Sequence, residues 1–233
     1  MRQHSGIGVL DKAMGVLYAV AEEPCTLSDL CARTGLPRAT AHRLAVGLEI
    51  HRLLTRDANG LWRPGPGLAE LAATASDTLL DAAASVLPRL REITGESVQI
   101  YRHEGSVRVC VASMEPPTGL RDTVLVGARL PMTAGSGAKV LLAWADPHAQ
   151  RAILPEAEFG ERALAEVRRR GWAQSAGERE PGVASVAAPI RDAVGNVVAA
   201  VSVSGPIDRI GRRPGARWAA DLLAAAEAIH KRL

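Results

Sequence analysis

Residues 25–63 read CTLSDLCARTGLPRATAHRLAVGLEIHRLLTRDANGLWR. Thr26 precedes a short apolar helical pattern as a candidate N-cap, and Gly35 stands where helices commonly end in left-handed backbone. Pro37 suits the start of a second helix, because its missing N–H would be unpaired there in any case. This stretch therefore predicts two short helices joined by a sharp turn.

The second predicted helix has two different faces. Leu44 and Leu48, with Ala41 and Ala45 beside them, form an apolar stripe. The opposite surface carries hydrogen-bond donors, namely Arg38, Thr40, His42 and Arg43. Two extended runs then flank residues 57–60, whose Asn-Gly pair is a hairpin signal. This order is typical of a winged helix-turn-helix, in which the N-terminal end of the second helix enters the major groove of DNA.

Basic residues also accompany the predicted hairpin, at Arg52, Arg56 and Arg63. We expect Arg38 and Thr40 to meet base edges, and Arg56 and Arg63 to reach phosphates or the minor groove, because arginines of this kind most often bind phosphate. The alternative is a purely structural three-helix cap with ordinary surface arginines. Double-stranded DNA is the predicted partner.

The whole chain sets limits on other functions. Its 233 residues fit a small domain plus one of ordinary size, and a net charge of +3 confines any DNA contact to a local patch. Three cysteines without paired spacing favour free thiols over disulfides or a zinc site, and no cofactor is predicted. With no secretory pattern and no apolar run near the roughly 20 residues of a membrane span, we expect a cytoplasmic protein.

The fold class predicted is α+β. Pro and Gly alternate over residues 64–67, which predicts a domain boundary there. We therefore expect residues 1–65 to form the winged helix-turn-helix, residues 66–94 to form linker helices, and residues 95–233 to form the second domain. Strands are predicted at 98–103, 107–114, 124–130, 183–190 and 197–204, and helices at 135–144, 162–170 and 217–233. Because strands and helices do not alternate strictly, a mainly antiparallel sheet with helices on its faces is favoured.

Two features of the second domain carry chemistry. The glycine-rich stretch 133–139 lacks P-loop spacing, and it predicts either a plain turn or a loop whose backbone N–H groups can meet a carboxylate. Ser202 and Ser204 share one strand face, and with Ser185 they can line a small polar pocket. No histidine lies near these serines in sequence to act as a base, so the alternative of an enzyme acting on a small acid lacks an acid–base pair.

Three segments, VGARLPMTAGSGAKVLLA (126–143), GWAQSAGEREPGVASVAAPI (171–190) and VSVSGP (201–206), follow the predicted winged helix. In this order the chain resembles the IclR-type transcriptional regulators. The resemblance implies a GAF/profilin-like effector domain with a curved antiparallel sheet, a homodimer or dimer of dimers, and a small polar or anionic effector. The pocket residues it implies are Ser136, Gly137, Ser175, Ser185, Ser202 and Ser204.

Two departures from the family pattern bear on the effector. Ala138-Lys139 replaces the usual Gly-Lys, and Ser175 stands where Asp is common, so a ligand amine would need Glu178 or Glu180 as its acidic partner. The segments GIGVLDKA (6–13), TGLRDT (118–123) and REPGVASV (179–186) are similar to the NdgR- and AreB-like actinobacterial regulators of leucine and amino-acid metabolism. The implied function is a metabolite-controlled regulator, with repression favoured, and a constitutive DNA-binding protein is the alternative.

Overall fold

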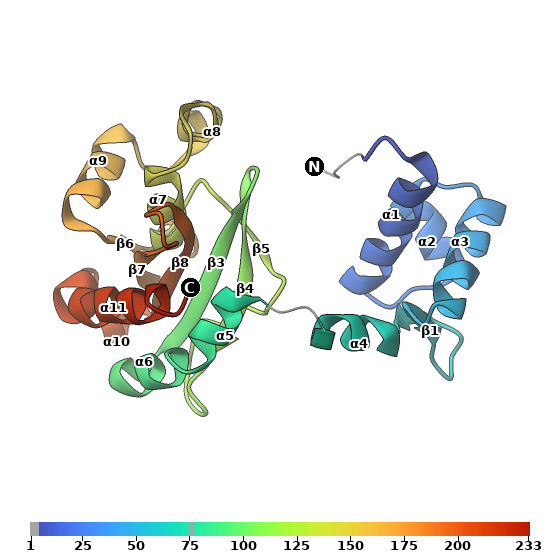
Figure 1. The fold of residues 1–233 in the computed structure, drawn as a ribbon, viewed down its shortest axis with the longest axis horizontal. Coiled ribbons are helices and arrows are strands. Elements are labelled where there is room, and N and C mark those ends of the chain that lie inside the picture. Colours follow the sequence, from blue (N-terminus) through green and yellow to red (C-terminus); the bar gives the residue numbers. More distant parts are fainter. Residues whose placement is uncertain (1–4, 75–76) are drawn as a thin grey trace. The chain divides into compact units, whose positions relative to one another are not determined.

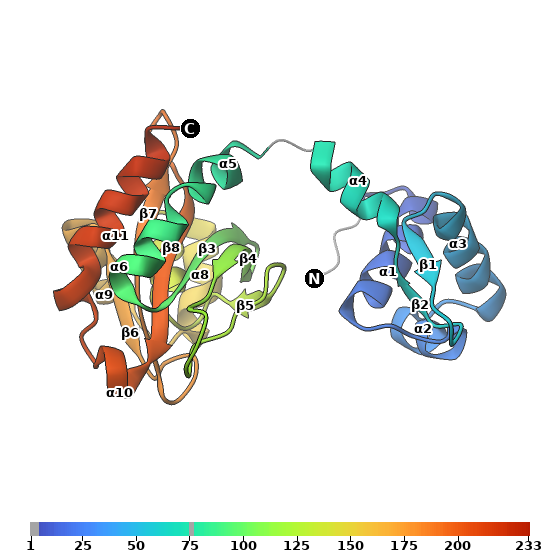
Figure 2. The same ribbon diagram turned by 90° about the horizontal axis from the view of Figure 1, so that it is seen from below.

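Helices and a short hairpin form the first of two units in the computed structural model, which describes residues 5–74 and 77–233. The boundary between the units falls between residues 76 and 77. The first unit contains α1 (Gly8–Glu22), α2 (Leu27–Thr34), α3 (Arg38–Ile50), β1 (Leu54–Arg56), β2 (Trp62–Pro64) and α4 (Pro66–Thr74). Figure 1 labels these elements except β2, which is labelled in Figure 2. The stretch predicted as linker helices, 66–94, is therefore divided between the units, and its residues 75 and 76 lie outside the described part.

The predicted helix caps are confirmed. The Thr26 hydroxyl accepts a hydrogen bond from the Asp29 N–H at 3.2 Å, and the Asp29 carboxylate accepts one from the Thr26 N–H at 3.0 Å. This reciprocal capping box begins α2. Gly35 ends α2 with φ of +69° in left-handed backbone, and Pro37 is the residue immediately before α3. Local chemistry thus determines the turn between α2 and α3.

The core of the first unit joins the helices to the hairpin. The buried side chains include Leu30 of α2, Ala41 and Ala45 of α3, and Trp62 of β2. The backbone of Cys25 also forms hydrogen bonds with Trp62 in both directions, at 3.2 and 2.9 Å. The hairpin is therefore packed against the helices as the wing of a helix-turn-helix, which leaves the opposite face of α3 uncovered.

The second unit is built on a six-stranded antiparallel sheet in the order β5-β4-β3-β8-β7-β6. Its strands are β3 (Ser97–Glu104), β4 (Val107–Met114), β5 (Arg129–Pro131), β6 (Ala173–Ala176), β7 (Val183–Arg191) and β8 (Val197–Pro206). Its helices are α5 (Thr78–Ala84), α6 (Leu87–Thr94), α7 (Ser136–Ala143), α8 (Pro147–Ile153), α9 (Glu161–Arg170), α10 (Ile207–Ile210) and α11 (Gly215–His230), with a 3₁₀ turn at Leu154–Glu156.

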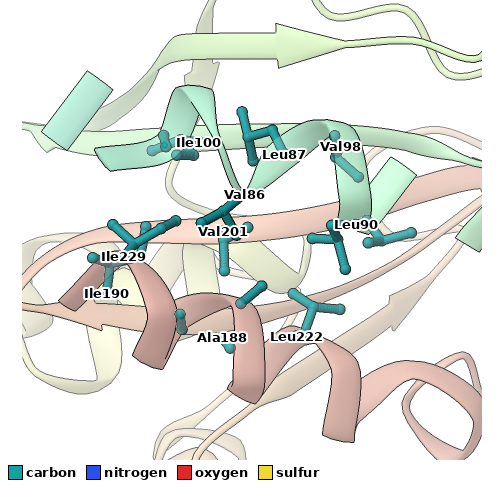
Figure 3. Close-up of a cluster of buried hydrophobic side chains, with 14 of the residues drawn as sticks. Val86, Leu87, Leu90, Val98, Ile100, Ala188, Ile190, Val201, Leu222 and Ile229 are labelled. Atoms are coloured by element: carbon teal, nitrogen blue, oxygen red, sulfur yellow. The ribbon is translucent and has the colours of Figure 1, made fainter. Parts of the chain in front are cut away.

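Helices cover the two faces of this sheet differently. Helices α5, α6 and α11 pack on one face, as Figure 2 shows for α6 and α11, while α7 and α9 lie on the other. In Figure 3, Leu90 of α6 and Leu222 of α11 lie against the sheet near Val201. Because side chains alternate along a strand, Ser202 and Ser204 of β8 face the opposite side from Val201. The apolar core and these serines therefore lie on opposite faces.

Some boundaries differ from the predictions. The run 124–130 was predicted to be extended, but only Arg129–Pro131 forms a strand, because Gly127 turns the chain with φ of +88°. The helical stretch before residue 94 is broken at Ser85 and Val86, and Pro88 occupies the first turn of α6, where its missing N–H costs little. Strand β6 and helices α8 and α10 are further elements that the sequence patterns did not predict.

Candidate DNA-reading surface and effector pocket

The exposed face of α3 carries most of the residues predicted to read DNA. Arg38, His42 and Arg43 are exposed and Thr40 is half-buried, whereas Ala41 on the opposite face is buried. Within residues 5–74 and 77–233, no carboxylate forms an ion pair with Arg38 or Arg43. Both guanidinium groups therefore keep their charge available for a phosphate or a base edge.

The three arginines around the wing are each held by a carboxylate. Arg52 Nη2 lies 2.6 Å from Glu70 of α4, and Arg56 Nη2 lies 3.3 Å from Glu49 of α3. Arg63 Nε lies 2.7 Å from Asp57, and this hydrogen bond lowers the pKa of the Asp57 carboxyl. These ion pairs orient the wing arginines and partly compensate their positive charge. Arg38 and Arg43 of α3 have no such partner among the described residues, a difference that the sequence did not reveal.

A second candidate site lies on the sheet face that carries α7. The six residues predicted to bind an effector all line one cavity of about 20 Å³. They come from the start of α7 (Ser136, Gly137), from β6 (Ser175), from β7 (Ser185) and from β8 (Ser202, Ser204). The structure thus brings residues that are far apart in the sequence, such as Ser136 and Ser204, together in one polar site.

Hydroxyl groups form one wall of the cavity. The Ser136 and Ser185 hydroxyls are 2.7 Å apart and share a hydrogen bond. Ser202 donates to the carbonyl of Val186 at 3.3 Å, and Ser204 donates to Gln99 Oε1 at 3.1 Å. Since each hydroxyl oxygen can still accept a hydrogen bond, this wall offers acceptors and exchangeable donors to a small polar ligand.

The helix α7 begins at the cavity, with Gly135 (φ +97°) as the preceding residue. The Gly135 N–H donates to Glu178 Oε2 at 3.2 Å, and the other oxygen of Glu178 pairs with Lys139 Nζ. Glu178 is therefore engaged by Lys139 and is not placed to receive a ligand amine. Glu180 does line the cavity, where it lies 3.4 Å from Arg179 Nη1.

Four large polar or charged residues of the cavity were not predicted: Tyr101, Arg108, Asp122 and Arg179. Arg179 Nη2 contacts both oxygens of Asp122, at 2.8 and 3.0 Å. These two residues are 57 positions apart, and no sequence pattern links them. For Arg108 a signal existed, because it precedes Cys110 by two positions in a predicted strand and therefore shares its inward face.

The described residues also bear on other functions. Among them, no group of three or more His, Cys, Asp or Glu side chains is arranged to hold a metal ion. No helix in the same residues has the length and apolar character needed to cross a membrane.

Comparisons with known families identify both units of the chain. The IclR helix-turn-helix domain matches residues 9–58, and the family described as bacterial transcriptional regulator IclR C-terminal matches residues 71–231. The chain is 32% identical over 214 residues to the glycerol operon regulatory protein of Streptomyces griseus, covering 85% of this chain and 84% of that protein. It is 29% identical over 222 residues to the transcriptional regulator BhcR of Paracoccus denitrificans, covering 88% of this chain and 80% of BhcR.

Solved structures of related proteins have the same fold. An IclR homologue from Microbacterium hydrocarbonoxydans, complexed with 4-hydroxybenzoate, matches with a TM-score of 0.87 at 27% identity, over 97% of this chain and 98% of that one. HmgR of Pseudomonas aeruginosa matches with a TM-score of 0.83 at 25% identity, over 97% of this chain and 99% of the HmgR chain. The related proteins are named as regulators of transcription and not as enzymes. This chain therefore belongs to the IclR family of bacterial transcriptional regulators, with an N-terminal DNA-binding domain and a C-terminal effector domain.

Proposed function

We propose that this regulator is a repressor that binds operator DNA through α3 and the wing, and that a small polar or anionic metabolite in the serine-walled cavity controls its affinity. The observation that carries the proposal is that Ser136, Gly137, Ser175, Ser185, Ser202 and Ser204 line one cavity in the effector domain. Because its work is on DNA, we place it in the cytoplasm with the chromosome.

For DNA recognition, we propose that Arg38, Thr40 and His42 contact the major groove and that Arg43 binds a phosphate at its edge. We propose further that Arg52, Arg56 and Arg63 contact the backbone beside it. The exposure of Arg38 and Arg43 without a described ion pair supports this division. Palindromic operators need two reading heads about one helical turn apart, so the active species is a homodimer or a dimer of dimers.

Packing within the effector domain suggests how the cavity affects the rest of the chain. Ser202 of β8 faces the cavity, while its neighbour Val201 faces the apolar core that contains Leu90 of α6. A ligand-dependent shift of β8 would therefore move the packing of α6, which follows the DNA-binding domain in sequence. A ligand acts only by binding the two arrangements with different affinity, and typical coupling of about 1–3 kcal/mol changes DNA affinity some five- to 150-fold.

The effector itself is a finer proposal. Related proteins differ in what their names indicate, from a glycerol operon to a complex with 4-hydroxybenzoate, so no ligand transfers directly to this chain. The similarity of segments 6–13, 118–123 and 179–186 to regulators of amino-acid metabolism supports an amino acid or a branched-chain intermediate of leucine metabolism as the signal.

The test uses the purified full chain and fragments of the genome that encodes it. Fragments retained by the protein are sequenced with and without L-leucine or 4-methyl-2-oxopentanoate. We expect a small set of fragments with a shared palindromic sequence, and a change in retention of at least about fivefold with an effective metabolite. Retention without any shared sequence would contradict specific binding. Retention that no metabolite changes, together with no thermal stabilisation by any of them, would favour a constitutive DNA-binding protein.

A further inference from the structure

A buried cation faces the effector cavity without an anion of its own. Arg108 of β4 is 3% exposed, and its hydrogen bonds to described residues, to the carbonyls of Pro131 and Ala134, both leave from Nη1. Its Nε is buried, and no described residue accepts a hydrogen bond from it. Burial lowers the pKa of Arg108 to about 10, so the group remains a cation at neutral pH.

The acidic groups near Arg108 are already engaged. Asp122 is held by two contacts to Arg179, and Glu178 is paired with Lys139. Tyr101 offers Arg108 only the face of its ring, whose centroid is 5.3 Å from the guanidinium carbon, and burial raises the pKa of its phenol, which stays neutral. Since a buried charge is costly unless it is paired, Arg108 retains an unmet demand for an anion.

Two glycines lie against the free edge of Arg108. A Cβ atom at Gly137 would lie 3.5 Å from Arg108 Nε and 3.3 Å from the Tyr101 ring. A Cβ atom at Gly135 would lie 3.1 Å from Arg108 Nη2. The missing side chains therefore border the two nitrogens, Nε and Nη2, that together form one edge of the guanidinium fork, which matches a carboxylate in a bidentate contact.

We propose that Arg108 binds the carboxylate of the effector through its Nε and Nη2 edge, and that the effector carries a single negative charge at this end. The proposal rests on the proposed role of the cavity as the effector site. A single charge follows from the pairing, because Arg179 already faces the carboxylates of Asp122 and Glu180. Among the described residues that line the cavity, Arg108 is therefore the cation without an ion pair. A second carboxylate on the ligand would meet Asp122 and Glu180.

The test compares carboxylates with their uncharged amides on the full-length protein. Butyrate and butyramide, 4-methyl-2-oxopentanoate and its amide, benzoate and benzamide, and L-leucine and L-leucinamide are titrated by calorimetry, with succinate as a dicarboxylate. We expect at least one monocarboxylate to bind at least about tenfold more tightly than its amide, equivalent to about 1.4 kcal/mol, and more tightly than succinate. The proposal is overturned if no acid in the panel is preferred over its amide.

Variants assign the preference to Arg108. In R108Q the affinities for the acid and for its amide should agree to within about twofold. R108K, which keeps the charge without the planar fork, should retain part of the preference for the acid. Arg129 of β5 is exposed and pairs with Glu104 outside the cavity, so R129Q is the control with the same change in charge and should bind like the wild type. If R108Q folds, as judged by circular dichroism and DNA binding, and keeps the preference, the proposal is wrong.

A second variant keeps the test decisive if R108Q fails to fold. G137A adds one methyl group beside Nε, and in a variant shown by circular dichroism to be folded it should weaken binding of the preferred acid by at least about tenfold. Undiminished binding by G137A would then overturn the proposal. Failure of the proposed function looks different: wild-type protein would bind an acid through Arg108, yet that acid would leave retention of genomic fragments unchanged.

Discussion

Arg43 of α3 offers a direct test of the DNA-reading surface, because its charge is exposed and is not compensated by any described carboxylate. We expect Arg43→Gln to remove one phosphate contact from each reading head. Each contact contributes about 0.9 to the slope of log affinity against log salt, so a dimer with two heads loses about 1.8. Between 50 and 200 mM salt, a slope change of this size alters the ratio of wild-type to variant affinity by about tenfold.

The assay is fluorescence anisotropy with a labelled duplex of random sequence, because phosphate contacts do not require the operator. The variant should be weaker at low salt and should approach the wild type as salt rises. Arg129→Gln makes the same change in net charge in the effector domain and should leave the slope unaltered. A parallel pair of salt curves for wild type and Arg43→Gln would refute the assignment of Arg43 to a phosphate.

Three further predictions concern the effector domain. Asp77 caps α5 and forms a bidentate pair with Arg102, so Asp77→Ala should cost about 1–2 kcal/mol in urea unfolding and Asp77→Asn, which can still cap, about 0.5 kcal/mol. The Arg102 hydrogen bonds lower the pKa of Asp77 in the folded state, so this stabilisation is present above about pH 4 and is lost as the pH falls through the lowered pKa. If the free energies of unfolding of wild type and Asp77→Asn differed by the same amount at all pH values, this reasoning would be contradicted. Burial raises the pKa of Cys110 to about 11, so in a thiol-labelling experiment the partly exposed Cys31 should react first and Cys110 only on unfolding. Leu222 is fully buried between α11 and the sheet, and Leu222→Ala should destabilise the domain by about 2–5 kcal/mol, whereas a loss below 1 kcal/mol would show that this core repacks freely.

Local patterns were sufficient for much of the fold. The capping box at Thr26, the left-handed Gly35 and the hairpin of β1 and β2 each depend on residues within a few positions of one another, so the helix-turn-helix could be predicted from them. The antiparallel strands β3 and β4 were also recognisable from alternation. The run before Arg129 is not the predicted strand, because the Ala128 N–H donates to the Leu125 carbonyl at 3.0 Å and closes a turn. The Gly127 N–H also donates to the Cys110 carbonyl, a contact with a residue far away in sequence that no local pattern indicates.

The candidate effector site was predicted only in part. Family resemblance pointed to Ser136, Gly137 and the serines of β6, β7 and β8, and the structure places them around one cavity. It also shows that Glu178 is occupied by Lys139, which removes one of the two acidic partners considered for a ligand amine. The ion pair between Glu178 and Lys139 joins residues that are far apart in the sequence. No spacing in the sequence therefore distinguishes an engaged carboxylate from a free one.

By itself, the sequence determined where the helices and most strands lie, that α3 presents arginines on one face, and that a polar loop begins α7. Only the tertiary structure decided which charges meet: Arg179 with Asp122, Lys139 with Glu178, and Arg108 with no described carboxylate. The physical reason is that helix caps and alternation act over a few residues along the chain. The balance of charge in a cavity instead depends on the register of distant strands, and on which side chains burial forces together.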